Sequence, residues 1–421
     1  MTELRLNGVR QQAVSGSRAG ALTAEHLRTI IQDSHLNFLI GAGTPSAYFG
    51  LLGNIEEALT ELADLQASDE SKAIVRASIQ AYFFEKVLLP NLKVVRRDAE
   101  TEGVLMSYAR FLRTLNRILL KRHSSILAKQ ANIFTTNVDM VFEVAFEQLG
   151  IDFSDGFTGK IRPRFDLGDF NTLRFRMSNR FEQRSEVPVF NLMKLHGSAG
   201  WLQGSGSATR TEILFDHGLT LVASVGTALD TARDHLVTIA NANEVVAPDL
   251  LAKVTVTAVP EPVRAFTAAY GRLGIVNPDK QKFATTVLNE TYYELIRRFA
   301  NELEKENSVL FAHGFSFRDE HLCDLVVRAA RSNPTLQVIV FCYSGVDRAE
   351  YQKLIPDVDV KNGNIYFVTP PEPAEGSEER KATLDAVTDD YFSPVIADKV
   401  PQPDQRIELD IRLPSDEGSD V

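Results

Sequence analysis

Asn137, Asp139 and His196 each follow a short apolar run, and their side chains can act on a hydroxyl group and on an attacking water. The amide of Asn137, in "TTNVD", can hold a water molecule or orient a hydroxyl group without adding charge. The carboxylate of Asp139 can accept from a hydroxyl group or stabilise a developing positive charge. The imidazole of His196, in "KLHG", can accept a proton when it is neutral near pH 7.

Each of these residues also has a purely structural interpretation. An Asn-x-Asp sequence after a strand commonly forms a turn or a helix cap, and a histidine before a glycine is commonly a hydrogen-bonded core residue. Taken alone, the three residues leave both interpretations open.

Two glycine-containing turns could approach a phosphate group closely. The first, in "LNFLIGAGTPSAYFG", consists of Gly41, Ala42, Gly43 and Thr44. Glycine lets the backbone approach a pyrophosphate, but a complete GxGxxG is absent and parallel sheets need glycine at strand ends in any case. The second turn, "GFS", contains Gly314 and Ser316. The Ser316 hydroxyl can bind a ligand oxygen, or it can cap the helix that begins at "RDEHL".

The sequence does not predict a metal site. Cys323 and Cys342 are the only two cysteines, too few for a four-cysteine zinc site, and we expect both to be buried. His313 and His321 lack an evident third or fourth ligand, so we interpret them as structural residues.

The elements that must position these residues are typical of an α/β fold. Short, nearly continuous apolar runs alternate with helical patterns, as in a parallel sheet covered on both faces. The predicted strands are residues 36–40, 131–139, 187–197, 273–278, 308–317, 336–344 and 364–369. The pattern predicts a Rossmann-like, doubly wound parallel sheet, with the four motifs at the carboxyl ends of its strands.

Helices and chain segments are predicted around this sheet. A helix capped by Thr23 precedes the first strand, and a helix from Val141 to Leu149 ends at Gly150. Residues 52–130 form an inserted helical module within a domain that spans 25–375. Residues 1–24 are predicted to be an N-terminal arm, residues 202–272 a further insertion, and residues 376–421 an acidic tail that follows a linker beginning near Pro370.

Charge and hydropathy restrict the class of protein. The net charge of −11 disfavours direct binding to nucleic acid, which would require a local basic patch. The first twenty residues lack the apolar segment of a signal peptide, and no apolar run reaches the length of a membrane span. We therefore expect a cytoplasmic protein.

The order of the four motifs resembles that of the sirtuin family. "GAGT" (41–44) resembles the family's GAG-Ser/Thr turn, "TTNVD" (135–139) its T-Q-N-I-D, "KLHG" (194–197) its L-H-G, and "GFS" (314–316) its G-T-S. The resemblance implies that NAD is the substrate, that residues 41–44 with Gly314 and Ser316 contact it, and that Asn137, His196 and Asp139 act on its ribose.

Two departures from the family's pattern change the expected reaction. The four-cysteine zinc module is replaced by about seventy residues without cysteine, so we expect no zinc. The segment that holds the nicotinamide end is replaced by "PSAYFGLLGN", which puts the acyl-lysine channel in doubt. With water as the nucleophile, the expected reaction is hydrolysis of NAD to nicotinamide and ADP-ribose. A zinc-free deacylase and a non-enzymatic sensor of NAD or ADP-ribose are the alternatives.

The segment from "GIVNPDKQKF" to "FSFRDEH" also resembles a bacterial branch of sirtuin-like proteins that act in anti-phage defence. That resemblance implies an effector that depletes NAD, and a partner that is a HerA-like hexameric ATPase. A homo-oligomer is also expected, with residues 52–130 and 202–272 as candidate contact surfaces or as additional core.

Overall fold

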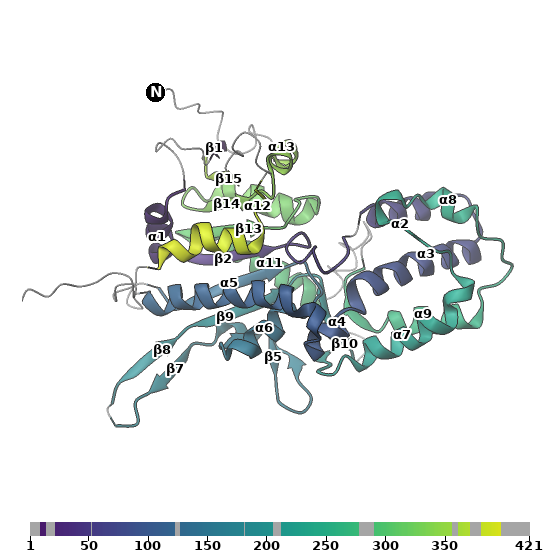
Figure 1. Ribbon diagram of the computed structural model, residues 1–421, viewed down its shortest axis with the longest axis horizontal. Helices are drawn as coiled ribbons and strands as arrows, with labels where there is room; N and C mark the ends of the chain where they lie inside the picture. The colour runs from purple at the N-terminus through teal and green to yellow at the C-terminus, as the bar shows by residue number, and fades with distance from the viewer. Residues whose placement is uncertain are drawn as a thin grey trace, which may run out of the picture.

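The computed structural model is an α/β protein with a large parallel sheet, helices on both faces of that sheet and a separate antiparallel sheet (Figure 1). The residues that it describes are 9–13, 22–51, 53–122, 127–180, 182–204, 212–277, 290–355, 361–370 and 380–396.

The large sheet has eight strands, and every neighbouring pair is parallel. Its spatial order is β1 (Val9–Ala13), β15 (Ile365–Thr369), β14 (Gln337–Phe341), β13 (Ser308–His313), β2 (His35–Ile40), β3 (Gln130–Thr135), β9 (Val189–Lys194) and β4 (Phe153–Ser154). The chain proceeds from β2 through β3 to β9 on one side, and from β13 through β14 to β15 on the other. The predicted doubly wound sheet is confirmed, and its switch point lies between β2 and β13.

Successive residues of the central strands enter two different apolar layers. Phe38 of β2 packs against Phe111 and Phe392, with ring centroids 5.6 and 5.9 Å away. The next residue, Leu39, belongs to the core on the opposite face. Because both faces are buried, the strand is apolar throughout instead of alternating with polar residues.

A ladder of asparagine side chains fixes the register of the central strands. Asn132 of β3 donates to the Oδ1 of Asn37 on β2 at 2.9 Å, and Asn191 of β9 donates to the Oδ1 of Asn132 at 2.8 Å. Asn37 in turn donates to the hydroxyl of Ser308 on β13 at 2.9 Å. A one-residue slip of any strand would separate these amides and reverse its apolar faces.

We expect Asn132→Ala to lower the free energy of unfolding by about 2–4 kcal/mol. The substitution leaves one acceptor on Asn37 and one donor on Asn191 unpaired, and each buried unpaired group costs about 1–3 kcal/mol. Denaturant titration measures the difference, with Asn301→Ala on an exposed face of α11 (Glu290–Glu304) as the control. Equal stability of the two variants would show that the ladder does not support the sheet.

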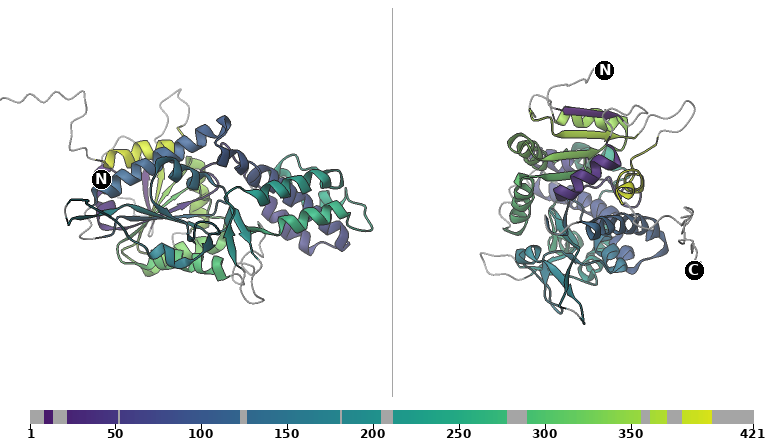
Figure 2. Two further views of the ribbon diagram at one scale, coloured as in Figure 1. Left: turned by 90° about the horizontal axis from the view of Figure 1, so that it is seen from below. Right: turned by 90° about the vertical axis from the view of Figure 1, so that its left-hand side faces the viewer.

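Two helical layers enclose the sheet (Figure 2). One face is covered by α1 (Ala24–Asp33), α5 (Glu102–Lys121), α6 (Val141–Leu149), α14 (Leu384–Val387), η7 (Thr388–Phe392) and η8 (Ser393–Val395). The other face is covered by α11, α12 (Glu320–Ser332) and α13 (Gly345–Leu354). The predicted Thr23 cap and the helix from Val141 to Gly150 are confirmed.

The ends of the chain differ from the predicted arm and tail. Residues 9–13 form edge strand β1, which pairs with β15. Residues 384–395 pack into the core through Leu384, Val387 and Phe392. The prediction that the acidic tail begins at residue 376 is therefore wrong for this part, because its apolar residues recur on one helical face. Residues 371–379 and 397–421 lie outside the described residues.

A helical lobe extends from the domain at one end of the long axis (Figure 1). It combines two distant segments: α2 (Ile55–Asp64) and α3 (Asp69–Phe83) pack with α7 (Thr220–Ala232), α8 (Ala247–Leu251) and α9 (Glu261–Tyr270). From α3 the chain returns to α5 through η1 (Phe84–Leu88), α4 (Asn91–Arg96) and η2 (Ala99–Thr101). Between α7 and α8 it forms η4 (Arg233–His235) and η5 (Ala242–Glu244). The two predicted insertions thus meet in space, whereas α5 belongs to the layer on the sheet.

The antiparallel sheet has the order β12 (Leu273–Ile275), β10 (Gly197–Gln203), β11 (Ile213–Phe215), β6 (Arg164–Phe165) and β5 (Phe157–Thr158), with η3 (Leu167–Asn171) nearby in the chain. The strand predicted at 273–278 belongs here and not to the parallel sheet. It pairs with β10, which continues directly from the "LHG" motif. A third sheet is the hairpin of β7 (Arg174–Met177) and β8 (Arg184–Val187). Among the described helices, none has the length and apolar character needed to cross a bilayer.

Candidate functional site

The switch point brings the four sequence motifs to one edge of the sheet. The four loops follow adjacent strands of the sheet. In spatial order they are residues 314–316 after β13, 41–44 after β2, 136–139 after β3 and 195–197 after β9. Hydrogen bonds extend the strand pairing into these loops, from the Gly41 amide to the His313 carbonyl at 3.0 Å and from the Leu195 amide to the Thr135 carbonyl at 2.8 Å. The loops are therefore held side by side.

The two glycine turns interlock. The Gly43 amide donates to the Gly314 carbonyl at 2.9 Å, and a Cβ on Gly41 would lie 2.4 Å from that same oxygen. Gly314 has φ +63°, and a Cβ there would lie 2.4 Å from the Thr44 amide nitrogen. All three glycines are thus required by the contact between the turns. In the 41–44 turn, only the Ala42 amide has no acceptor among the described residues.

The Thr44 hydroxyl is engaged by His313. The Nε2 of His313 lies 2.9 Å from the Ala382 carbonyl, to which it donates, so Nδ1 accepts from the Thr44 hydroxyl at 2.8 Å. Burial lowers the pKa of His313 to about 4, which keeps this imidazole neutral. The structural interpretation of His313 is confirmed, and the Thr44 hydroxyl proton is not directed at a ligand.

Asn137 joins the "TTNVD" loop to the first glycine turn. Its Nδ2 donates to the Gly41 carbonyl at 3.2 Å, and its backbone amide donates to the Thr135 hydroxyl at 3.0 Å. The side chain is 7 % exposed, and its Oδ1 has no hydrogen-bond partner in the described part of the chain. A fixed amide with an unpaired buried acceptor can receive a hydroxyl group or a water.

Helices inserted between β2 and β3 position this loop, a role that the sequence did not reveal. The Oδ1 of Asn91 in α4 accepts from the Met140 amide at 2.8 Å. Tyr108 of α5 lies beside Asn137 and Asp139. Burial, and then the charge of Asp139, raise the pKa of its phenol well above the usual value, and the side chain of Asn137 opposes the increase. Residues 29 to 49 positions apart meet here, and no local pattern predicts such contacts.

Asp139 occupies a more enclosed position than expected for a group that contacts substrate. It is 3 % exposed, and its Oδ1 accepts from the Val141 amide at 3.0 Å, which makes it a turn residue at the start of α6. Burial raises the pKa of this carboxylate, and the positive charge of Lys194 opposes the increase.

Lys194 and Glu143 form a buried ion pair beneath the loops. The two side chains are 2 % and 7 % exposed, and Nζ lies 3.2 Å from Oε1. Lys194 also donates to the Asp139 carbonyl. Burial raises the pKa of Glu143 to about 7 despite the nearby ammonium group. The pair holds the "TTNVD" loop and the end of β9 together, and it was not predicted.

His196 is the half-buried imidazole of the site, and a carboxylate lies behind it. Its Nε2 is 3.4 Å from the Oδ2 of Asp319, with side chains 17 % and 10 % exposed. Asp319 also caps α12 by accepting from the Leu322 amide at 3.3 Å. This pair connects the "LHG" loop to the segment after "GFS". No role at this site was predicted for Asp319 from the sequence.

Ser316 lies at the surface of the second turn. Its side chain is exposed, and its hydroxyl accepts from the Arg318 amide at 3.5 Å. The alternative prediction that Ser316 caps the following helix is wrong, because Asp319 is the cap. Cys323 and Cys342 are buried as predicted.

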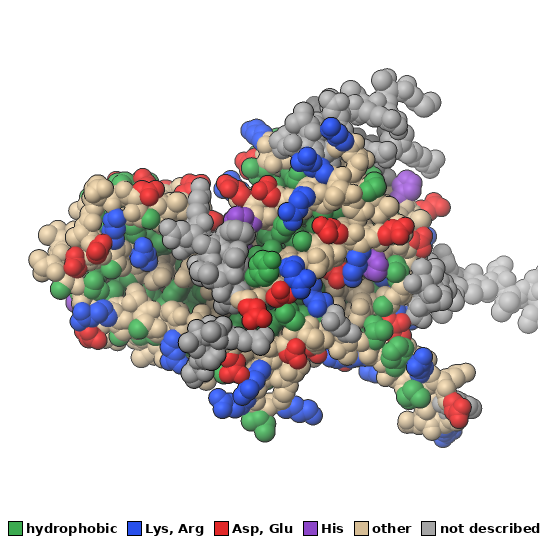
Figure 3. Space-filling model, turned by 180° about the vertical axis from the view of Figure 1, so that it is seen from behind, with side chains coloured by type: hydrophobic (Ala, Val, Ile, Leu, Met, Phe, Trp, Pro, Cys, Tyr) green, Lys and Arg blue, Asp and Glu red, His purple; other side chains and the backbone are tan. Residues whose placement is uncertain are grey.

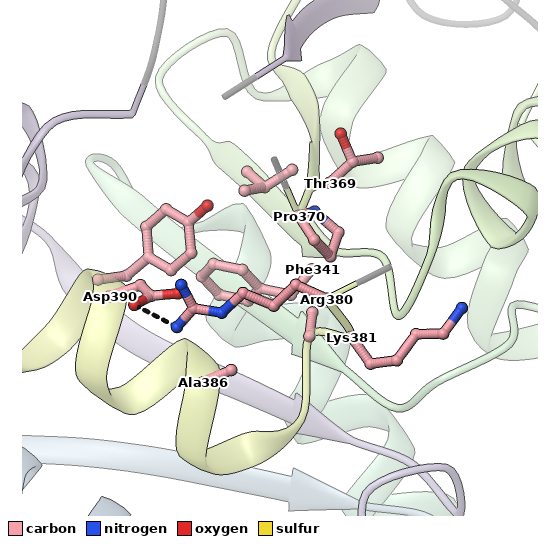
Figure 4. A pocket seen from close by; sticks show the side chains of 10 residues that line it. Phe341, Thr369, Pro370, Arg380, Lys381, Ala386 and Asp390 are labelled. Carbon is pink, nitrogen blue, oxygen red and sulfur yellow. Dashed lines mark hydrogen bonds and ion pairs between the residues drawn. The ribbon is translucent and has the colours of Figure 1, made fainter. Parts of the chain in front are cut away.

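A pocket lies beside the predicted residues, at the ends of β15 and of β14, the neighbour of β13 (Figure 4). Phe341, Tyr391 and Pro370 form part of its wall, and an ion pair of 2.7 Å joins Arg380 to Asp390 beside it. The pocket touches Ala382, whose carbonyl binds His313. It therefore borders the interlocked turns without including Asn137 or His196. The described residues contain no cluster of three or more potential metal ligands.

No protein family model matches this chain, and no curated protein matches it.

The geometry supports acid–base chemistry on a bound hydroxyl group or water. A buried amide with a free acceptor, a half-buried imidazole backed by a carboxylate, and two interlocked glycine turns all lie at the switch-point edge. A base oriented by a third group is the usual arrangement for activating a nucleophile.

Proposed function

We propose that this edge binds NAD and hydrolyses the bond between its nicotinamide and ribose. The observation that carries the proposal is the series of contacts that links all four motifs. Asn137 contacts the first turn, that turn contacts the second, and Asp319 after the second turn contacts His196. The sirtuin-like order of the motifs supports NAD as the molecule bound.

The chemistry of NAD determines what the residues must do. The nicotinamide ring is cationic in NAD, so it leaves as a neutral group and takes the electron pair of the broken C–N bond. No acid is needed for this departure. The barrier lies in the oxocarbenium-like carbon, and it falls when the ribose is fixed and a nucleophile is held nearby.

Asn137 and His196 have complementary roles in the proposed reaction. The free Oδ1 of Asn137 accepts from a ribose hydroxyl or from the attacking water. As the water oxygen bonds to the anomeric carbon, one water proton passes to His196, and Asp319 stabilises the imidazolium that forms. The proton then returns to solvent, which leaves ADP-ribose and nicotinamide. In this proposal Asp139 does not contact the ribose itself; it holds the "TTNVD" loop, which carries Asn137.

We expect Asn137→Ala to lower the kcat of nicotinamide release by about 10²–10³-fold, the loss typical of one preorganised polar group. Chromatography of the reaction mixture measures nicotinamide, and Asn301→Ala on α11 is the control. Wild-type kcat in the Asn137→Ala variant would contradict the assignment.

Two further assays separate the alternatives. Formation of O-acetyl-ADP-ribose from acetylated peptide and NAD would indicate the zinc-free deacylase. Binding of NAD by the wild-type protein without release of nicotinamide would indicate a sensor. The biological proposal, an anti-phage effector that depletes NAD with a HerA-like ATPase, rests on the resemblance alone. Measuring the NAD turnover with and without that ATPase tests it.

A further inference from the structure

The β7–β8 hairpin projects from the body of the molecule (Figures 1 and 3). Phe175 and Met177 alternate with Arg174 and Arg176 along β7, so the two apolar side chains share one face. They are 45 % and 64 % exposed. A two-stranded ribbon with both faces in water is only marginally stable by itself.

The base of the hairpin is firmly attached to the domain. Arg174 forms an ion pair of 2.7 Å with Asp152, and the carboxylate of Glu186 accepts from the Lys129 amide at 2.7 Å. The ribbon is therefore directed outward by fixed contacts. Beyond the base, residues 175–180 and 182–185 are exposed.

The outer part of the hairpin carries three arginines against one exposed carboxylate, Glu182, in a protein that is acidic as a whole. Arg176, Arg180 and Arg184 are exposed, and no carboxylate in the described part of the chain forms an ion pair with them. Arg184 lies over the Phe175 ring, 5.2 Å from its centroid. Arg184 pairs with Met177 and so shares the apolar face, whereas Arg176 lies on the opposite face. The apolar face with Arg184 fits an acidic surface with an apolar spot.

Such a surface exists at the opposite end of the long axis (Figure 1). Glu57, Glu61 and Asp64 occupy positions i, i+4 and i+7 of α2, so they share one helical face, and all three are exposed. None of these carboxylates pairs with a cation among the described residues. Val246, 42 % exposed, lies at the start of α8, which packs against α2.

We infer that the β7–β8 hairpin of one copy docks on the α2 face of a second copy. The two surfaces have opposite charge and lie at opposite ends, so one molecule cannot satisfy both. A contact between unlike surfaces is heterologous, and it closes into a ring where the rotation allows. Charge sets the specificity of the contact, while Phe175 and Met177 bury apolar area. The inference is independent of the proposed reaction.

Charge reversal tests the contact on the full-length protein. We expect wild type to assemble at micromolar concentration, and Arg180→Glu/Arg184→Glu and Glu57→Arg/Glu61→Arg each to be monomeric. A chain that carries all four changes restores the complementarity, so it regains the wild-type mass. Light scattering after gel filtration measures the mass. Arg328→Glu/Arg331→Glu on α12 is the matched control, since it makes the same charge change at exposed positions outside both surfaces.

Specific outcomes would overturn the inference. A monomeric wild-type protein, or hairpin variants with the wild-type mass, would show that the hairpin does not join copies. Failure of the fourfold variant to reassemble, with its melting temperature unchanged, would show that α2 is not the docking surface. If the hairpin variants lose only binding to an added nucleic acid or to an ATPase, the occupant is not a second copy.

Discussion

His196→Ala is expected to lower the kcat of NAD hydrolysis by about 10²–10⁴-fold, the usual contribution of a positioned acid–base group. The imidazole is half-buried, and its Nε2 faces Asp319 at 3.4 Å, which leaves Nδ1 as the nitrogen available to a water. Chromatography of nicotinamide in samples quenched at a series of times measures the rate. The KM for NAD should change little, because the proton transfer occurs only in the transition state.

Two variants make this prediction specific. Asp319→Asn retains an acceptor for the Leu322 amide and removes the charge behind the imidazole, so we expect an intermediate loss of kcat. His235→Ala, at an exposed position in the helical lobe, should retain the wild-type rate. If His196→Ala also retains the wild-type rate, His196 is not the base and the proposed mechanism is wrong.

The second large effect is on stability. We expect Lys194→Met to lower the free energy of unfolding by about 3–5 kcal/mol, because it leaves the buried carboxylate of Glu143 without its cation. The pKa of Glu143 is already raised by burial from 4.5 to about 7, and loss of Lys194 raises it further. The pKa in the folded state then exceeds that of the unfolded chain, so the unfolded state releases its proton first as the pH rises.

Relative to wild type, the deficit of Lys194→Met should therefore be smallest below about pH 7, where Glu143 is protonated in both folded proteins, and should grow as the pH rises above 7. Thermal unfolding at several pH values measures this dependence. The double variant Lys194→Met/Glu143→Gln removes the unpaired carboxylate of Glu143 but leaves the buried carboxylate of Asp139 without the nearby ammonium group, so we expect it to recover part of the loss. A pH-independent deficit would locate the cost in packing rather than in the charge of Glu143.

Local sequence was sufficient to predict most of the framework. Six of the seven predicted strands lie in the parallel sheet, because a strand buried on both faces must be apolar along its length. Residues 273–275 were assigned to the wrong sheet, since their apolar character is the same in either environment. Residues 384–395 were assigned to a tail because they follow a segment rich in proline and acidic residues. The amphipathic helix that they begin with is too short to give a clear periodic pattern.

The sequence by itself determined the doubly wound topology and the placement of four loops at the carboxyl ends of strands. The spacing of apolar residues and the residue types in the turns encode these features locally. Parallel pairing of the strands then brings the loops to one edge of the sheet. Only the tertiary structure decided which side chains meet there. Three contacts depend on how the helices and strands pack: Asp319 with His196, Tyr108 with Asn137, and Lys194 with Glu143. Pairs of polar residues far apart in the chain have no periodic signature, so their partners became evident only when the backbone was folded.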